Sequence, residues 1–585
     1  MDPPARQTVE SLTLLFVTTI KFRHVESVCI DNAILRIFAT FLTVASMIRD
    51  QVHHQATPHT TVVTPCDGRY RRATSIRLPP TAPPQGWPMD RNCMLIPLFI
   101  ASALASATGT ADLTIGQLTF SACELSRPKS SATTAALCAP FEVPENRDAP
   151  NGRKIALRLA LIRAESGSPK SDIVVYLAGG PGQAATETYS GMAGALAPLN
   201  RTHHILLLDQ RGTGGSHALK CAHADEEKDY DDEDENNAGV DHEIEQMQSE
   251  LTDCLSKLDA DPRFYTTSDA VRDLEDVREK LGKPQFDLVG VSYGTRMAQA
   301  YLRAHADGVR SVILDGVVPN EMIVGASFAG DLESALKLDF VNCNKSPECA
   351  KRFGDPYKTL YALRGKLRDS PSRVTIADPQ TFQPIQRSVN ESTLAGLVRL
   401  FAYSSETAAL LPLSLDQAIH GNYAPLLGQS KLISGDLDVS ITGGMELSVI
   451  CAEDADLLKP TPEDADTILG NKVLEGIQAE CKIWPHGTRP ADFHTPLKSD
   501  KSILLLSGEN DPVTPPANAE LVLKNLPNGR HLIAKGQGHN VILRGCLPRL
   551  AAKFVDTLDA KKLDAACVDT LGPVPAFLDF NGAAP

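Results

Sequence analysis

The pentapeptide Gly290-Val291-Ser292-Tyr293-Gly294 contains the residue with the clearest potential for chemistry. A serine hydroxyl is a weak nucleophile, so it needs unhindered presentation beside a general base. A sharp strand-to-helix turn at Ser292 would provide this, because glycines two residues to either side let neighbouring backbone pack closely. We therefore expect Ser292 to be a nucleophile.

A carboxylate and a histidine follow this serine in the order that such a turn requires. Asp511 lies in a loop directly after a predicted strand, and the prolines that follow should hold that loop. Glu509 is the alternative acid in the same loop. His539 ends the Gly-flanked segment Lys535-Gly536-Gln537-Gly538-His539. We predict that His539 is the general base and that Asp511 orients it.

A glycine-rich loop, Leu177-Ala178-Gly179-Gly180-Pro181-Gly182, precedes the serine in the chain. Backbone N–H groups without side-chain cover can stabilise the oxyanion that forms when a hydroxyl attacks a carbonyl. We expect one donor from Gly179 or Gly180 and a second from the N–H of Tyr293. A simple turn is the alternative interpretation of the loop.

Short apolar segments alternate with helical patterns from residue 154 onward, as in a mostly parallel sheet covered by helices. Before the serine turn, apolar residues recur every three or four positions, Thr267 or Ser268 can cap the start and Gly282 closes the end. A further helix is expected over Arg296–Arg303. The predicted strands are Ile155–Leu161, Ile173–Leu177, His204–Leu208, Phe286–Val291, Val309–Leu314, Ile503–Leu506 and His531–Ala534.

This alternation is lost over residues 318–445, where helical periodicity dominates in Glu391–Phe401 and Thr407–Ala418. We interpret the segment as a helical cap inserted into an α/β core. The core would then comprise residues 120–317 and 446–585.

The amino-terminal region contains a segment typical of exported proteins. Residues 89–107, MDRNCMLIPLFIASALASA, combine an early arginine, an apolar run and small residues suited to cleavage, as in a secretory signal peptide. Residues 1–88 are then a non-native or disordered extension. A membrane anchor at Ala33–Ile48 is the alternative, although it is shorter than the roughly 20 residues that a spanning helix needs. We expect a periplasmic or secreted protein whose mature chain has no stable membrane insertion.

The cysteines favour the same compartment. Ten of the 13 follow the signal-like segment, and disulfides persist in oxidising compartments. Their spacings suggest no zinc site. The expected disulfides join sequence neighbours: Cys123–Cys138, Cys221–Cys254, Cys343–Cys349, Cys451–Cys481 and Cys546–Cys567.

The charge of the chain excludes one class of partner. A formal net charge of −15 argues against nucleic-acid binding, which requires a basic face. The acidic charge is concentrated in Asp225–Glu235, where nine carboxylates surround Lys228. We interpret this run as a solvated loop, with calcium binding as the alternative.

Taken together, the motifs resemble the prolyl and tripeptidyl aminopeptidase branch of the α/β-hydrolases. The most specific string is Asp209-Gln210-Arg211-Gly212-Thr213-Gly214-Gly215-Ser216, and the resemblance covers Cys138 to Cys567. It implies an α/β-hydrolase fold with an inserted cap, and removal of residues from a free amino end. Within the string, we expect Asp209 and Arg211 to stabilise loops by ion pairing.

The segment Met445–Asp454 is similar to the one that follows the cap in secreted tripeptidyl aminopeptidases. A buried carboxylate there could bind the ammonium group of a substrate, and Glu453 and Asp454 are the candidates. Surface acids beside a disulfide are the alternative. The sequence lacks the HYF-type cap signature of single-proline iminopeptidases, which argues against proline specificity.

The expected function is that of an exported serine exopeptidase that acts on peptides through an acyl-enzyme, with no cofactor and no metal. A carboxylesterase or lipase-like hydrolase is the alternative, because the same three residues do not determine the leaving group. A non-catalytic binding protein with the same fold is a further alternative.

Overall fold

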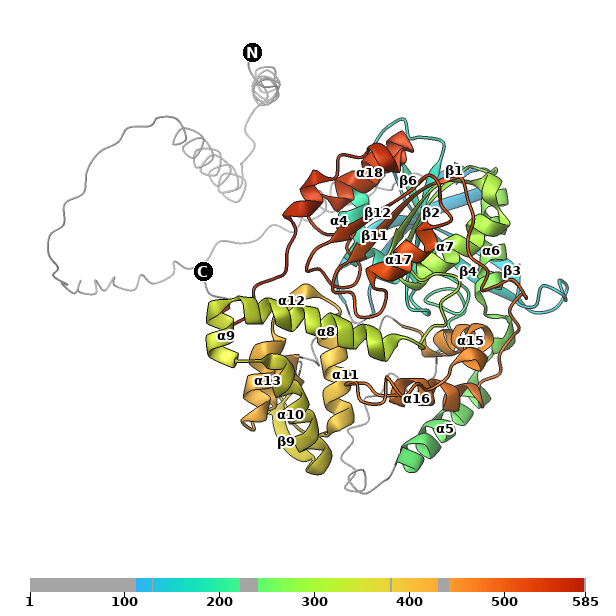
Figure 1. Cartoon of the computed structure of the whole chain (residues 1–585). Coiled ribbons are helices and arrows are strands. Elements are labelled where there is room, and N and C mark those ends of the chain that lie inside the picture. The colour runs from blue at the N-terminus through green and yellow to red at the C-terminus, as the bar shows by residue number, and fades with distance from the viewer. Residues whose placement is uncertain (1–111, 129, 221–239, 379–380, 430–440, 583–585) are drawn as a thin grey trace, which may run out of the picture. The chain divides into compact units, whose positions relative to one another are not determined.

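A ten-stranded sheet lies at the centre of the computed structural model, which describes residues 112–128, 130–220, 240–378, 381–429 and 441–582 (Figure 1). Its strand order is β1-β2-β3-β4-β6-β5-β7-β8-β11-β12. From β6 to β12 neighbouring strands are parallel, whereas β1 to β4 and the β4–β6 pair are antiparallel. The strands are β1 (Leu113–Ile115), β2 (Leu118–Ser126), β3 (Thr133–Pro144), β4 (Lys154–Ile162), β5 (Ile173–Leu177), β6 (His204–Leu208), β7 (Phe286–Val291), β8 (Val309–Asp315), β11 (Ser502–Gly508) and β12 (Gly529–Ala534).

All seven strands predicted from the sequence are present, and the predicted α/β-hydrolase fold is confirmed. Every residue of β5, β6 and β7 is buried, which explains their continuous apolar sequences. The prediction omitted β1, β2 and β3. Strand β2 has mostly exposed positions, and the apolar run of β3 consists mainly of alanine, which favours strands only weakly, so neither resembles the buried strands of the core.

Helices cover both faces of the sheet. One face packs against α6 (Thr267–Lys280), α7 (Tyr293–Ala304) and α17 (Pro516–Leu523), and the other against α4 (Ala185–Asn200) and α18 (Leu547–Thr557). The predicted helix before the serine is α6, although its N-cap lies one residue earlier than expected. The hydroxyl of Thr266 accepts a hydrogen bond from the N–H of Asp269 at 3.2 Å.

Residues 318–445 contain most of the helices outside the sheet layers, grouped on one side of the sheet portion (Figure 1). The predicted helix over 391–401 is α11, whereas the one over 407–418 is two helices, because a new helix begins at Leu411 with Pro412 in its first turn. The segment also contains a hairpin that the sequence analysis did not predict. These elements are α8 (Phe328–Lys345), α9 (Pro347–Phe353), α10 (Pro356–Asp369), β9 (Ser372–Ala377), β10 (Pro384–Val389), α11 (Glu391–Ala402), α12 (Ser405–Ala408) and α13 (Leu411–Ile419).

Four of the five expected disulfides are present: Cys123–Cys138, Cys343–Cys349, Cys451–Cys481 and Cys546–Cys567. Cys254 is also disulfide-bonded, but its expected partner Cys221 lies outside the described residues.

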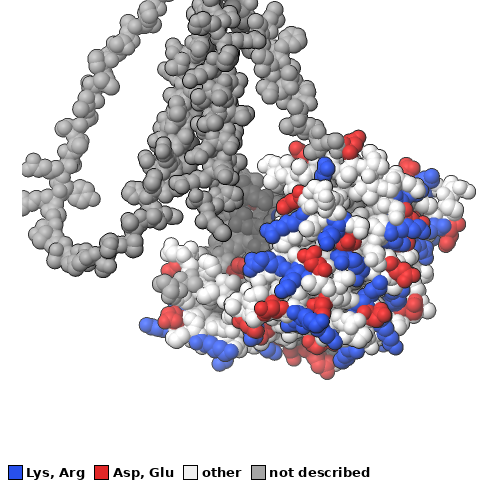
Figure 2. Space-filling model, turned by 90° about the horizontal axis from the view of Figure 1, so that it is seen from above, with Lys and Arg blue, Asp and Glu red and all other residues white. Residues whose placement is uncertain are grey.

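Lysine, arginine, aspartate and glutamate side chains are interspersed over the face of the molecule seen in Figure 2. In the part of the chain that the structure describes, no helix is both long and apolar enough to cross a bilayer. The extension over 1–88, the signal-like segment over 89–107 and the acidic run over 225–235 lie outside that part.

Candidate active site

Ser292 occupies the turn between β7 and α7, with φ of 54° and ψ of −125°. A positive φ is uncommon for a residue other than glycine and costs about 1–3 kcal/mol, so the surrounding structure must stabilise it. Val291 and Tyr293 on either side are buried, whereas Ser292 is partly exposed. The turn therefore presents Ser292 at the carboxyl end of a buried strand.

The glycines around Ser292 allow three backbone segments to meet. A Cβ on Gly290 would lie 2.5 Å from the carbonyl oxygen of Gly294, and a Cβ on Gly294 would lie 2.2 Å from that of Leu177. Both distances are far below van der Waals contact. The close backbone approach expected from the sequence is thus present, and it joins the serine turn to the end of β5.

His539 and Asp511 lie together beyond the ends of β12 and β11. The Nδ1 atom of His539 is 2.8 Å from Oδ2 of Asp511. The carboxylate of Asp511 also accepts hydrogen bonds from the N–H groups of Val513 at 3.0 Å and Thr514 at 2.8 Å. The hydroxyl of Thr514 donates to Asp511 Oδ2 at 2.7 Å and lies 3.1 Å from His539 Nδ1. Sequence reasoning missed Thr514, although its position three residues after the acid is typical of such a turn.

These contacts set the protonation of the pair. Burial disfavours the imidazolium, but the charge and hydrogen bond of Asp511 and the charge of Asp315 outweigh it and raise the pKa of His539. Burial also disfavours the carboxylate of Asp511, yet His539 and the N–H groups of Thr514 and Val513 lower the pKa of Asp511. With Nδ1–H donated to Asp511, the other ring nitrogen of His539, Nε2, is the one available as a base.

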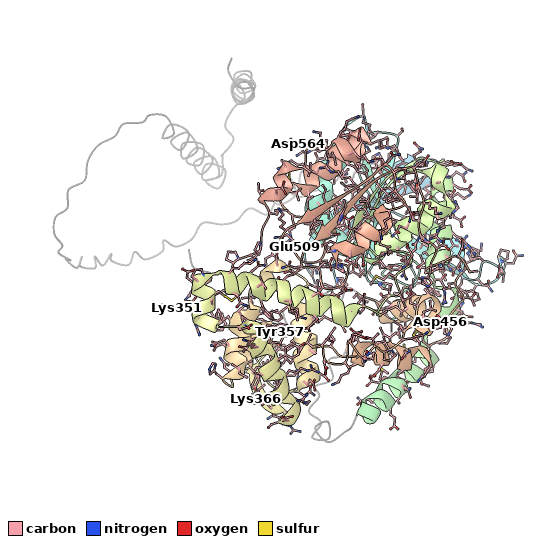
Figure 3. The ribbon with its side chains drawn as sticks, viewed as in Figure 1. Lys351, Tyr357, Lys366, Asp456, Glu509 and Asp564 are labelled. Atoms are coloured by element: carbon pink, nitrogen blue, oxygen red, sulfur yellow. A yellow bond between two sulfur atoms is a disulfide. The ribbon has the colours of Figure 1, made fainter. Side chains whose placement is uncertain are left out.

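Glu509, the alternative acid, has a different partner. Its Oε2 atom accepts a hydrogen bond from the N–H of Gly536 at 2.8 Å. The residue is exposed and lies where the sheet portion meets α8 (Figure 3). The preference for Asp511 over Glu509 therefore agrees with the geometry.

His539 lies beside the strand neighbour of Ser292. The N–H of Ser292 donates to the carbonyl of Asp315 at 2.8 Å, which places Gly316 next to the serine turn. A Cβ on Gly316 would lie only 2.9 Å from Cε1 of His539. The imidazole therefore covers Gly316, and the structure brings Ser292, His539 and Asp511 to one edge of the sheet.

The glycine-rich loop lies against the serine turn. A Cβ on Gly179 would lie 3.0 Å from the Cβ of Ser292, and Gly180 adopts a positive φ of 98°. The N–H of Thr442 donates to the carbonyl of Gly182 at 2.9 Å, so the loop is held from its far side. Tyr293 is the first residue of α7, where the N–H groups have no acceptor within the helix. Gly179 of the loop and the first residue of α7, Tyr293, thus lie on two sides of Ser292.

A chain of buried polar side chains fixes Tyr293. Its hydroxyl accepts a hydrogen bond from Gln210 Nε2 at 3.1 Å and lies 2.6 Å from Oγ1 of Thr267. Thr267 in turn donates to Glu453, from its N–H at 2.7 Å and from its hydroxyl at 2.9 Å. The serine turn is therefore connected to α6 and to α15 (Gly443–Glu453).

Glu453 and Asp454, the predicted amine-binding acids, lie in this buried network. Nη1 of Arg296 is 2.6 Å from Oδ2 of Asp454 and 3.9 Å from Oε2 of Glu453, and none of the three side chains is more than 1% exposed. Burial raises the pKa of Glu453 to about 8 despite the nearby charge of Arg296. An incoming ammonium group would have to compete with Arg296 for these carboxylates.

Asp209 and Arg211 stabilise loops, but not by pairing with each other. Arg211 is fully buried and binds Asp273 through two hydrogen bonds, Nε to Oδ2 at 2.6 Å and Nη2 to Oδ1 at 2.7 Å. Asp209 instead accepts hydrogen bonds from the N–H and hydroxyl of Thr186, both at 2.8 Å, and from the N–H of Gly215 at 3.0 Å. The expectation of ion pairing is therefore correct for Arg211 and wrong for Asp209.

Among the described residues, one group has ligand atoms close enough for a metal ion: Asp172, His203 and Asp287. Arg310 already binds this group, since its Nη2 atom is 2.8 Å from Asp172 Oδ2 and 3.0 Å from Asp287 Oδ2. A guanidinium thus occupies the place of a cation. The group also lies near the beginning of β7, at the opposite end of this strand from Ser292.

Comparison with protein families agrees with the fold. Residues 172–345 match the family described as alpha/beta hydrolase fold, and residues 466–567 match the family described as TAP-like protein. The chain is therefore similar to α/β-hydrolase peptidases, and it is a serine hydrolase.

Several relatives are similar over most or part of their length. The chain is 25% identical over 459 residues to the serine protease Hip1 of Mycobacterium tuberculosis, covering 72% of this chain and 85% of Hip1. It is 22% identical over 449 residues to the putative hydrolase YuaR of Escherichia coli, covering 71% and 84% of the two chains. It is 29% identical over 153 residues to a proline iminopeptidase of Neisseria gonorrhoeae, covering 26% and 35%. The chain is accordingly a serine peptidase of the α/β-hydrolase type.

Proposed function

We propose that this protein is an exported exopeptidase that removes residues or short peptides from the free amino end of peptides. Ser292 is the nucleophile, His539 the general base, and Asp511 the acid that orients the imidazole. The substrate is a peptide, and the reaction proceeds through an acyl-enzyme. The single observation that carries this proposal is the placement of the Asp511–His539 pair over Gly316, beside the strained turn that presents Ser292.

The acylation step follows from the protonation of the pair. The Nδ1–H of His539 is donated to Asp511, so Nε2 accepts the hydroxyl proton while Oγ of Ser292 attacks the peptide carbonyl carbon. The imidazolium that forms is stabilised by the carboxylate of Asp511. It then protonates the leaving nitrogen as the C–N bond breaks, which leaves an ester on Ser292 and releases the shortened peptide as an amine.

The oxyanion of the tetrahedral intermediate binds backbone N–H groups. The N–H of Tyr293 is one donor, and Gly179 or Gly180 supplies the other. The network of Gln210, Thr267 and Glu453 around the Tyr293 side chain supports this assignment, because it keeps the first turn of α7 fixed. Removal of one such donor typically lowers kcat by about 10²–10³-fold.

Deacylation uses the same residues in reverse. A water molecule enters after the amine has left, and His539 removes its proton as the water oxygen attacks the ester carbonyl. The ester C–O bond then breaks, the imidazolium returns the proton to Oγ of Ser292, and the amino-terminal fragment leaves as a carboxylic acid that loses its proton to solvent.

The exopeptidase assignment is supported by the similarity to peptidases and by the inserted segment over 318–445. The gonococcal relative is a proline iminopeptidase, and the carboxyl-terminal part of the chain matches a TAP-like family. Glu453 and Asp454 remain the proposed ligands of the substrate amine. The amine would have to compete with Arg296, and Glu453, whose pKa burial raises to about 8, would have to lose its proton when the amine binds.

Export is supported by the disulfides. Four are present among the described residues, and they join pairs separated by 6 to 30 positions in the sequence. Such bonds persist in a periplasmic or extracellular environment. We propose residues 89–107 as the signal peptide, so the mature amino terminus should lie near Thr108 or Gly109; sequencing the amino terminus of natively exported protein tests this.

The function is tested with a panel of anilides that differ only at the amino end. We expect hydrolysis of amino-free mono-, di- or tripeptidyl anilides and at least tenfold lower kcat/KM for the same substrates after amino acetylation. Ser292→Ala should be inactive on all of them and should keep the wild-type melting temperature. Equal hydrolysis of free and acetylated substrates would identify an endopeptidase or an esterase instead, and turnover by Ser292→Ala would exclude Ser292 as nucleophile.

A further inference from the structure

Asp315, the last residue of β8, binds both the turn that presents Ser292 and the segment that follows His539. Its carbonyl accepts the hydrogen bond from the N–H of Ser292 at 2.8 Å. On its other side, β8 pairs with β11, where Asp315 is the partner of Leu506. The backbone of Asp315 is therefore fixed between the strand that leads to the nucleophile and the strand that leads to the acid.

The carboxylate of Asp315 binds the segment that carries His539. Its Oδ1 atom accepts a hydrogen bond from the N–H of Val541 and its Oδ2 atom one from the N–H of Ile542, both at 2.9 Å. These amides lie two and three residues after His539 in the chain. Asp315 is fully buried, and Val541 and Ile542 are at most 1% exposed, so water does not compete for the two bonds.

The backbone between His539 and the amides of Val541 and Ile542 has a constrained conformation. Asn540, which separates His539 from Val541, has a φ of 63°. The imidazole of His539 covers Gly316, the residue next to Asp315, where a Cβ would lie 2.9 Å from Cε1. A shift of the Val541 and Ile542 amides would therefore move the imidazole relative to Ser292, since the backbone between them is short.

We propose that Asp315 is a positioning residue that fixes His539 relative to Ser292 and stabilises the imidazolium by its charge. This inference rests on the proposed function, because it assumes that His539 is the base for Ser292. Asp315 does not contact the imidazole through a hydrogen bond of its own, so it acts through the segment that it binds. Its role is distinct from that of Asp511, which holds the ring directly.

The charged and titratable groups around His539 allow a separate test of whether the charge of Asp315 stabilises the imidazolium. Asp511 faces it from the loop after β11, Asp315 from the end of β8, and Tyr403 from the end of α11 with its ring centroid 5.5 Å away. Burial, together with the nearby charge of Asp315, raises the pKa of Tyr176 in β5. Burial raises the pKa of Asp315 to about 6, while its two backbone hydrogen bonds and His539 act to lower it. Asp315 is therefore ionised above pH 6 and favours protonation of His539.

The test compares wild-type protein with Asp315→Asn. An asparagine keeps one acceptor but turns an NH₂ group toward the second amide and removes the charge. We expect kcat/KM on an amino-free peptidyl anilide to fall about 10- to 100-fold, as for a misplaced catalytic group. The acidic limb of the kcat/KM profile should move to lower pH by about 0.5–1 unit, because the imidazolium loses a nearby negative charge. Unchanged kcat/KM and an unchanged acidic limb would overturn the inference.

Asp287→Asn is the matched control, because Asp287 is equally buried but lies near the beginning of β7 and binds Ser311 and Arg310. We expect it to lower the melting temperature without moving the acidic limb. An equal displacement of the limb in both variants would mean a general effect of destabilisation and would overturn the inference.

Two further measurements keep the test decisive. If Asp315→Asn does not fold, Asp315→Glu keeps the charge but pushes the segment outward by one methylene. Slower labelling of Ser292 by a fluorophosphonate in that variant, with an unmoved acidic limb, supports the inference, whereas wild-type labelling overturns it. If wild-type protein itself is not labelled at Ser292, the proposed function fails and this inference fails with it; normal wild-type labelling with normal variants refutes the inference alone.

Discussion

The Nδ1 atom of His539 lies 2.8 Å from Oδ2 of Asp511, in a pair whose side chains are 6% and 0% exposed. This contact determines which ring nitrogen can serve as the base. It also distinguishes Asp511 from the other candidate acid, Glu509. Glu509 follows the same strand but accepts a hydrogen bond from the N–H of Gly536.

Replacement of Asp511 by asparagine should lower kcat by about 10³–10⁴-fold, because the amide no longer selects the tautomer with Nδ1 protonated and does not stabilise the imidazolium. Steady-state kinetics on a saturating peptidyl anilide measure this. Glu509→Gln is the matched control and should remain within about threefold of wild type. A larger loss in Glu509→Gln than in Asp511→Asn would reverse the assignment of the acid.

Thr514→Val should lower kcat by roughly tenfold, since the hydroxyl that donates to Asp511 Oδ2 at 2.7 Å is replaced by a methyl group of similar size. Thr514→Ser keeps the donor and should recover most of the activity. The comparison of kcat for the two variants isolates the hydroxyl from the shape of the side chain. Equal activity of valine and serine at this position would show that the hydrogen bond does not contribute.

The sequence predicted those parts of the fold whose burial is complete. Strands β5, β6 and β7 are apolar throughout because helices cover both of their faces, so their bounds match the predicted ones. Strands β2 and β3 form an antiparallel pair with exposed positions, and they lack this signal. The strands buried in the core, including the antiparallel strand β4, were therefore predictable, whereas the more exposed strands β1 to β3 were not.

In the candidate active site, too, some features could be predicted from the sequence and others could not. Ser292, Asp511 and His539 each end or follow a strand and have glycine or proline nearby, so local sequence marks them. Several contacts that hold the surrounding segments join residues that are distant in the sequence: Asp315 and Val541 are 226 positions apart, and Arg296 and Asp454 are 158 apart. Such pairs are created by the order of strands in the sheet, which local patterns do not reveal.

Glu453 should make the protein less stable as the pH rises. Burial raises its pKa in the folded state to about 8, above the ordinary value of 4.5, so the folded protein holds a proton that the unfolded chain loses. The contribution to stability is then fully present below about pH 4.5 and is lost as the pH rises toward 8. Urea unfolding of wild type and Glu453→Gln at pH 5, 6.5 and 8 measures it.

In that experiment, the free energy of unfolding of Glu453→Gln should fall less between pH 5 and 8 than that of wild type. The same variant examines the proposed role in amine binding. If Glu453 binds the substrate amine, KM for an amino-free substrate rises more than KM for its acetylated form. A parallel change for both substrates would assign Glu453 to the support of Tyr293 alone.

The disulfides should differ in their contribution to stability according to the length of chain that each closes. Cys451–Cys481 spans 30 positions and Cys343–Cys349 spans 6. By loop-closure entropy, loss of the longer link costs about 3.6 kcal/mol and loss of the shorter one about 2.2 kcal/mol. Chemical denaturation of the two double-alanine variants measures both. A larger loss for the Cys343–Cys349 variant would mean that packing around the sulfurs, and not chain entropy, controls these bonds, since Cys343 and Cys349 are both buried.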